Sequence, residues 1–483
     1  MIGRAGTGSV PDPTVAKSPL SNTTALLISR IAIAILSWAG TTVIVRSLDV
    51  DDWGRFSFVF SLLALASVLT DLGVGRIALG EVLPDQPGRS VAAGNYLLLR
   101  TGLGVIGYGL VIAFVQLSGY DPQIVRATVI GGAVLVFGTI VGAWNIAFQA
   151  QERLGHVAFS SVVAQLGQVA LIVAISLRGG ALLWFVAAAV VRDAVLLPWR
   201  ARRGSALLPV IWKLDTKLLG RMMREALPLS VGIILQTAIW RIDVIMLSKL
   251  GSLEDVGNYG VAYKFADLAH ALPMAMSAAL LAPMVKAWSS DRSAFGQIYT
   301  TSGRVLMISA GFAVVQMGLF APDVIGLFFT DTYVDAAFAG QLLMLAQAGA
   351  FPAALAFTTL VAAGRLVAYP IAAGLALLLN VGANLLLIPQ YGFVGAAVAT
   401  VVTEFVLAAL LLATTSRLSN LESRPDFLLV RVAVVSVFAG ATGLGLAWLG
   451  VPWIVSMVAV TAVFLAAASK AGYRGILQSL GRA

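Results

Sequence analysis

The chain contains fourteen long apolar runs, and its positive charges gather between alternate pairs of them. If each run is taken as a membrane helix, the 32 Lys and Arg residues divide into 22 on one side, 5 on the other and 5 within the runs. The 23 acidic residues show no such bias, with 9, 9 and 5. Because short loops rich in Lys and Arg stay in the cytoplasm, the sequence predicts a multi-pass membrane protein with both termini cytoplasmic.

Composition excludes a soluble domain. Hydrophobic residues make up 59% of the chain and charged residues only 11%, which leaves too little polar surface for a water-soluble protein of this length. The net charge of +9 lies in short loops and forms no continuous stripe, so it fits anionic lipid better than nucleic acid. The absence of cysteine excludes disulfides and thiolate metal sites.

The predicted architecture is an all-α integral membrane protein of about fourteen transmembrane helices. Most of the runs approach the roughly 20 residues that span about 30 Å of hydrocarbon. The predicted spans are 24–46, 54–75, 91–118, 123–149, 157–178, 180–200, 224–248, 257–284, 300–321, 335–362, 366–388, 391–414, 429–449 and 451–470. The predicted domains are a disordered cytoplasmic tail (1–23), a six-helix lobe (24–203), a basic cytoplasmic linker (204–223), a second six-helix lobe (224–414), and an accessory helix pair with a short cytoplasmic tail (415–483).

The two lobes resemble copies of each other. Asp52-Trp53-Gly54-Arg55-Phe56 follows the first helix of one half, and Asp255-Val256-Gly257-Asn258-Tyr259 follows the first helix of the other. A longer match aligns Arg153-Leu154 with Arg365-Leu366, and Asp193 with Glu404. Six helices per copy keep both copies in the same orientation, which predicts a parallel repeat about an axis along the membrane normal, with a cleft between the lobes.

Several short motifs lie in the second lobe. They are Leu227-Pro228-Leu229, Arg241-Ile242-Asp243, the run 257–264 (GNYGVAYK), Leu272-Pro273, Asn380-Val381, the run 388–397 (IPQYGFVGAA) and Thr403-Glu404. Together they resemble the polysaccharide-transporter branch of the multidrug/oligosaccharidyl-lipid/polysaccharide exporter superfamily, over most of the chain from Arg30 to about Ala413. The resemblance implies a two-lobed flippase that moves a polyprenyl-pyrophosphate-linked oligosaccharide from the inner to the outer leaflet.

Ionisable side chains within the spans are the candidate functional residues, because a charge at mid-bilayer needs a partner or a water-filled cavity. Arginine suits a pyrophosphate headgroup because its planar fork binds phosphate bidentately. The predicted headgroup cavity consists of Arg30, Arg100, Arg241, Lys264, Asn380 and Asn384. The alternative for these residues is structural: the cations form ion pairs that lock helices together, and the asparagines bond across helices.

Acidic residues within the spans are the candidates for coupling to an ion gradient. Asp267 and Glu404 lead, and Asp243 and His270 complete the set. Lys264, Asp267 and His270 recur every three residues and therefore share one helical face. Lys264 and Asp267 could instead neutralise each other, and His270 could serve packing. No cofactor or metal is expected, and the coupling ion would be H⁺ or Na⁺.

Competing functions are separated by the balance of charges. A drug/cation antiporter of the same superfamily should have a cavity dominated by acids and aromatics, whereas cations and acids within these spans are equal, 5 to 5. A membrane-embedded glycosyltransferase would need a large outer loop with catalytic carboxylates, and no such loop is predicted. A peptidoglycan-precursor flippase stays open as an alternative. Expected partners are the lipid-linked glycan, the lipid bilayer of the inner (plasma) membrane, and polymerase and glycosyltransferase components of a polysaccharide pathway.

Overall fold

The computed structural model describes residues 19–418 and 426–469, and every long element in that part of the chain is a helix. The elements are α1 (Pro19–Ser47), α2 (Val50–Asp71), α3 (Val74–Glu81), α4 (Arg89–Leu117), α5 (Pro122–Ala143), α6 (Asn145–Ala150), α7 (Leu154–Leu177), α8 (Leu182–Leu207), α9 (Thr216–Leu250), α10 (Leu253–Ser290), α11 (Arg292–Phe328), η1 (Asp331–Tyr333), α12 (Ala336–Ala362), α13 (Ala368–Ser416), α14 (Asp426–Trp448) and α15 (Trp453–Ala468). The predicted all-helical fold is confirmed.

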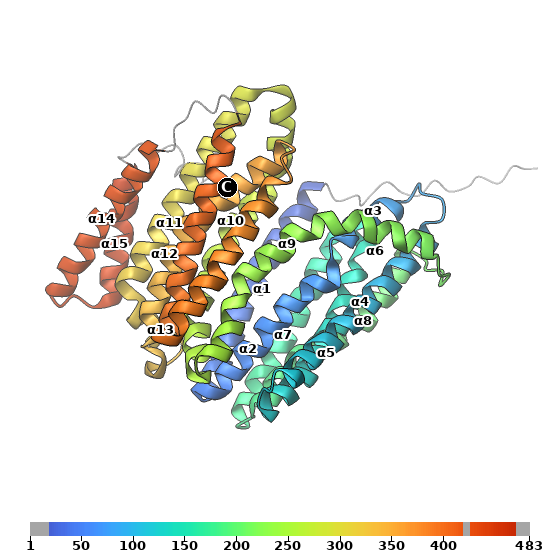
Figure 1. The fold of residues 1–483 in the computed structure, drawn as a ribbon, viewed down its shortest axis with the longest axis horizontal. Coiled ribbons are helices and arrows are strands. Elements are labelled where there is room, and N and C mark those ends of the chain that lie inside the picture. The colour runs from blue at the N-terminus through green and yellow to red at the C-terminus, as the bar shows by residue number, and fades with distance from the viewer. Residues whose placement is uncertain (1–18, 419–425, 470–483) are drawn as a thin grey trace, which may run out of the picture.

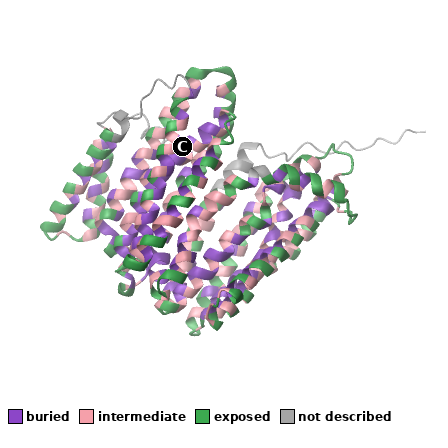
Figure 2. Ribbon diagram, viewed as in Figure 1, coloured by how far each residue is buried: buried purple, intermediate pink, exposed green. Residues whose placement is uncertain are grey.

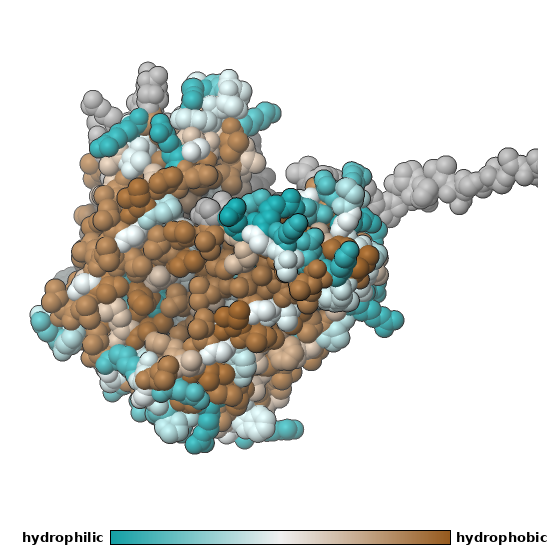
Figure 3. Space-filling view, turned by 45° about the vertical axis from the view of Figure 1, so that its right-hand side comes forward, coloured by the Kyte–Doolittle hydropathy of each residue, from teal (hydrophilic) through white to brown (hydrophobic). Residues whose placement is uncertain are grey.

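Within the described residues, twelve helical segments are long and apolar enough to cross a membrane. One of them, α13, contains two of the predicted spans, and α15 corresponds to the last predicted span but has only 16 residues. Figure 3 shows the result as a broad apolar face with hydrophilic groups gathered toward its upper and lower margins. The chain is therefore a multi-pass membrane protein.

Several helix ends differ from the predicted boundaries. Helix α1 begins at Pro19, so the last residues of the predicted tail are helical, whereas residues 1–18 and the C-terminal tail from residue 470 lie outside the described part. The predicted span 54–75 is interrupted because Leu72 adopts a left-handed conformation (φ 45°) that ends α2. The predicted linker is mostly helical at its ends, since α8 continues to Leu207 and α9 begins at Thr216.

The helices form two bundles that repeat the same packing. Helix α1 packs on α7 in the first lobe as α9 packs on α13 in the second, and the pairs α2–α5 and α4–α5 correspond to α10–α12 and α11–α12. Helices α14 and α15 pack on each other and on α11, at the edge of the second lobe (Figure 1). Buried residues concentrate where helices within a bundle face each other (Figure 2). The predicted parallel repeat is thus visible in three dimensions.

A kink at Gly392 separates two helices within α13, which correspond to the predicted spans 366–388 and 391–414. Its φ of 53° and ψ of −134° are not helical, and such a backbone conformation is accessible mainly to glycine. Asp255 at the start of α10 accepts a hydrogen bond from the Phe393 amide at 3.3 Å, and a Cβ at Gly392 would collide with the same carboxylate. The kink therefore ties α13 to the first turn of α10.

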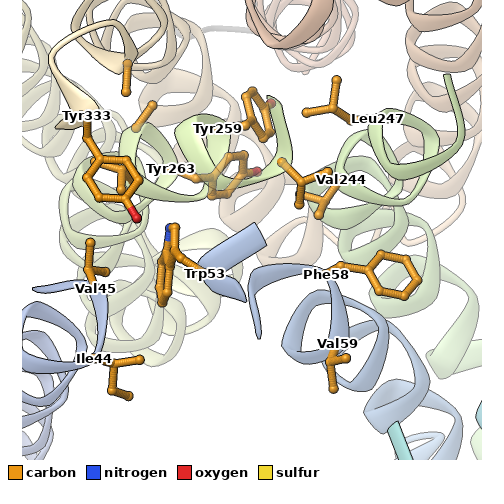
Figure 4. Packing of buried hydrophobic residues seen from close by; sticks show 14 of the residues in the cluster. Ile44, Val45, Trp53, Phe58, Val59, Val244, Leu247, Tyr259, Tyr263 and Tyr333 are labelled. Atoms are coloured by element: carbon orange, nitrogen blue, oxygen red, sulfur yellow. The ribbon is translucent and has the colours of Figure 1, made fainter. Parts of the chain in front are cut away.

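The two lobes meet where the repeated motifs lie. A Cβ on Gly54 of α2 would overlap the Leu253 carbonyl oxygen of α10, and a Cβ on Gly257 of α10 would lie 2.7 Å from the Val50 carbonyl oxygen of α2. The indole Nε1 of Trp53 donates a hydrogen bond to the Gly257 carbonyl at 3.0 Å. Figure 4 shows Trp53 among buried side chains from both lobes, including Tyr259, Tyr263 and Tyr333. We call this contact between α2 and α10 the glycine seam.

The connection between the lobes is also held in place. The Asn95 side chain donates to the Lys213 carbonyl at 2.8 Å and accepts from the Asp215 amide at 2.8 Å. Arg221 of α9 pairs with Glu81 of α3 at 2.8 Å. The basic segment predicted as a linker is therefore docked on α3 and α4, and the start of α9 belongs structurally to the first lobe.

Candidate functional site

The largest polar cavity near the predicted site lies inside the first lobe. It has a volume of about 680 Å³ and is lined mainly by α2, α4, α5, α7 and α8. Its charged lining residues are Arg100, Arg192, Asp193 and Arg200. Three cations against one acid give this N-lobe cavity, as we call it, a positive lining.

Arg100 projects from α4 and forms an ion pair with Asp71 at the end of α2. The Arg100 side chain is only 9% exposed, whereas Asp71 is 54% exposed. The buried Nε of Arg100 has no hydrogen-bond partner within the described residues. The guanidinium is therefore held by one water-exposed acid, and it retains a donor for another group.

Arg192 and Arg200 project from α8 toward polar side chains of α7. Arg192 bonds to Asp193 at 2.8 Å and reaches the amide oxygens of Gln165 (3.4 Å) and Gln168 (3.3 Å). Arg200 is almost fully buried and donates to Asn145, to the hydroxyl groups of Ser160 and Ser161, and to the Val157 carbonyl. Gln165 and Gln168 are not among the predicted site residues. Their polar side chains, three residues apart in an apolar run, were the sequence feature that could have indicated this site.

A second, smaller pocket of about 100 Å³ lies at the seam between the lobes. Arg241, Lys264 and Asp267 line it from the second lobe, and serines and phenylalanines of α2 line it from the first. Arg241 pairs with Asp267 at 3.2 Å and lies over the Tyr263 ring. Lys264 forms no ion pair within the described residues. Phe60 and Ala64 line both this seam pocket and the N-lobe cavity, so the two spaces adjoin.

Asp243 lies deep beside the seam pocket but does not pair with Arg241. Its carboxylate accepts hydrogen bonds from the Tyr259 hydroxyl at 2.5 Å and from the Val244 amide at 2.8 Å, and the Thr400 hydroxyl lies 3.4 Å away. The side chain is fully buried. These bonds connect α9, α10 and the second half of α13.

The remaining predicted residues of the second lobe fall into two places. Glu404 and His270 line a pocket of about 60 Å³ together with Gln236 and Trp240. The His270 ring contacts Trp240 edge-on and lies 3.3 Å from the Gln347 amide oxygen. Asn384 donates to Asn380, which donates to Thr403, and both asparagines are completely buried.

The predicted headgroup set is therefore divided among several places. Arg241 and Lys264 share the seam pocket with Asp267, and Arg100 lines the adjoining N-lobe cavity. Arg30 is exposed on α1 and forms no ion pair within the described part of the chain. Across residues 19–418 and 426–469 no group of three or more His, Asp or Glu side chains could hold a metal ion.

The chain is similar to known proteins in sequence and in fold. A family model described as "Polysaccharide biosynthesis protein" matches residues 20–286. Among curated proteins, a probable multidrug resistance protein NorM from Rhizobium meliloti (strain 1021) is 26% identical over 144 residues, which cover 28% of this chain and 30% of that relative. The match thus spans less than a third of the relative's length.

The fold is shared with solved transporters. The Lipid II flippase MurJ in an inward closed conformation superposes with a TM-score of 0.76 at 12% identity, covering 95% of this chain and 100% of that one. A multidrug resistance MATE family transporter of the MOP superfamily gives 0.70 at 15% identity in an inward-facing conformation, covering 84% of this chain and 99% of that one. A structure described as the outward-facing conformation of a multidrug resistance MATE family transporter gives 0.57 at 17% identity, covering 84% of this chain and 97% of that one.

Proposed function

We propose that this chain, which belongs to the family described as polysaccharide biosynthesis proteins, moves a polyprenyl-pyrophosphate-linked oligosaccharide from the inner to the outer leaflet. The observation that supports this most is the positive lining of the N-lobe cavity beside the seam pocket. A pyrophosphate that leaves the headgroup region of the membrane needs several fixed cations along its path. Arg100, Arg192 and Arg200 supply them in the first lobe, and Arg241 and Lys264 supply them at the seam.

The transport cycle proposed is alternating access of the two lobes. The glycine seam joins the lobes at the end that carries the loops predicted to be outside, so this conformation would open to the cytoplasm. The superposition score is higher with the inward-facing MATE family structure (0.70) than with the outward-facing one (0.57), which supports the same state. Opening the seam would then expose Arg241 and Lys264 to the outer side.

Coupling to H⁺ or Na⁺ is proposed to run through buried acids of the second lobe. Glu404 is the first candidate, because it is buried beside a small pocket that no Lys or Arg side chain lines. Asp267 already pairs with Arg241, and Asp243 is occupied by hydrogen bonds. His270 lines the same pocket as Glu404 and is the candidate for passing a proton to it. Residence in the inner membrane with cytoplasmic termini, and partnership with polymerase and glycosyltransferase components, belong to the same proposal.

A peptidoglycan-precursor flippase is the second candidate function, favoured by the superposition with MurJ over the whole length of that protein. A drug/cation antiporter is less well supported, since the cavity lining has an excess of cations.

The test uses proteoliposomes that contain fluorescent lipid-linked substrates. The protein should move a lipid-linked oligosaccharide faster than a lipid-linked disaccharide-pentapeptide, and the reverse order would assign it to the second candidate. Arg241→Lys should slow transport and Arg241→Ala should slow it more, with folded yield measured for each. Full transport by an Arg30→Ala, Arg241→Ala double variant would remove both residues from headgroup binding, and lost yield would indicate a structural charge lock with Asp267.

A further inference from the structure

A groove runs between α7 and α8 on the first lobe. Its volume is about 440 Å³, and its lining is mainly apolar. Phe159, Val163 and Val195 on its margins are exposed, as expected of side chains that face lipid. Gly167 and Ala188 provide the hollow because their side chains are absent or short.

The groove adjoins the N-lobe cavity through shared lining residues. These are Ala164, Gln168, Arg192 and Leu196. Arg192 lies at the junction, 30% exposed, held by Asp193 on one side and by the amide oxygens of Gln165 and Gln168 on the other. One continuous path therefore leads from an apolar surface that faces lipid, past the Arg192 guanidinium, to the cationic N-lobe cavity.

We propose that this groove binds the polyprenyl chain of the lipid-linked substrate, with the pyrophosphate near Arg192 at the mouth of the cavity. The proposal rests on the proposed function and adds the place where the chain lies during transport. An apolar groove has little advantage over surrounding lipid tails, which are equally apolar. Selectivity for the polyprenyl chain must come from the junction. There the pyrophosphate contacts Arg192 only if the attached polyprenyl chain lies in the groove.

A filled groove provides the test. A Cβ on Gly167 would meet no atom within 4 Å, so Gly167→Leu should fold and occupy the groove. Gly109 on α4 is equally open and lies away from both spaces, which makes Gly109→Leu the matched control. Val195→Trp fills the groove from α8 and serves as a second variant if Gly167→Leu gives low folded yield.

The probe is a photoreactive polyprenyl pyrophosphate incorporated into proteoliposomes with the full chain. We expect cross-links in α7 and α8 peptides, reduced at least tenfold by Gly167→Leu or Val195→Trp and unchanged by Gly109→Leu. Transport of the lipid-linked oligosaccharide should fall in parallel. A photoreactive phospholipid should label the groove weakly and be displaced by polyprenyl pyrophosphate.

The outcomes separate the groove from the function. Undiminished transport by the filled-groove variants, or cross-links confined to other helices, would overturn the groove assignment and leave the flippase proposal standing. Equal labelling by the phospholipid without displacement would make the groove a general lipid site, which also overturns it. No transport of any lipid-linked glycan by the unaltered protein would refute the proposed function itself.

Discussion

Trp53 offers a direct measure of how strongly the glycine seam holds the lobes together. Its side chain is completely buried, packs with Phe56 and Tyr259 in a cluster drawn from both lobes, and donates to the Gly257 carbonyl. If the seam opens during transport, these contacts exist in only one of the two states. Replacing Trp53 with alanine should therefore destabilise the closed seam relative to the open one.

The magnitude follows from the size of the cavity created. Truncating a buried Trp costs about 3–5 kcal/mol in packed interiors, and the lost hydrogen bond adds about 1 kcal/mol. Taking about 3 kcal/mol, because a seam between two bodies can partly collapse, the closed-to-open equilibrium shifts by about 150-fold. An open state populated at about 1% would rise to about 60%.

Spin labels across the seam measure this shift. Asp51 on α2 and Glu254 on α10 are exposed and lie one turn before Gly54 and Gly257, and the chain has no cysteine to interfere. In reconstituted protein, the label-to-label distance distribution should gain a longer component in Trp53→Ala. Phe464→Ala, which removes a buried ring from the α11–α14–α15 contact, should lower stability without changing that distribution. An unchanged distribution in folded Trp53→Ala would refute the view that this side chain holds the seam closed.

Three further predictions concern other parts of the chain. Single cysteines at Ser205 and Ser252 should react with an impermeant reagent in intact cells only at Ser252, and labelling of Ser205 would overturn the predicted topology. Glu404→Gln should slow transport and flatten its dependence on an imposed H⁺ or Na⁺ gradient, whereas unchanged gradient dependence in proteoliposomes would remove Glu404 from coupling. Gly392→Ala should lower unfolding stability by about 1–3 kcal/mol because its backbone conformation is strained for alanine. Gly374→Ala, at an open helical position of α13, should not, and equal thermal stability of the two variants would contradict the role given to the kink.

Much of the fold could be predicted because hydrophobic length and loop charge act locally. The positions of the spans follow from runs of apolar residues, and the duplication follows from motifs such as those around Gly54 and Gly257. The breaks within helices were harder, because the left-handed conformation of Leu72 has no local sequence signal. Pro389 and Gly392 lie at the predicted break between the spans 366–388 and 391–414, but the hydrogen bond from the Phe393 amide to Asp255 depends on tertiary packing.

The candidate site was less predictable because partners lie on different helices. Arg100 and Asp71 are 29 residues apart, and Arg241 and Asp267 are 26 apart, so a search one helical turn away finds neither pair. Arg200 is the last residue of the predicted span 180–200, yet α8 continues past it and buries it. The face that each helix buries depends on how it packs against the other helices, and the sequence of one helix alone does not determine it.

In the glycine seam each copy of the repeat makes the same contact on the other copy. Gly54 approaches the carbonyl of Leu253, and Gly257 approaches the carbonyl of Val50. The repeat aligns Gly54 with Gly257 and Val50 with Leu253, so each contact is the counterpart of the other. Such mutual contact of one patch with its own copy is the mark of a twofold homodimer. A half-length ancestor with a single copy of the motif could have closed the same contact between two identical subunits. The two copies have not stayed identical, since Trp53 of the first corresponds to Val256 of the second.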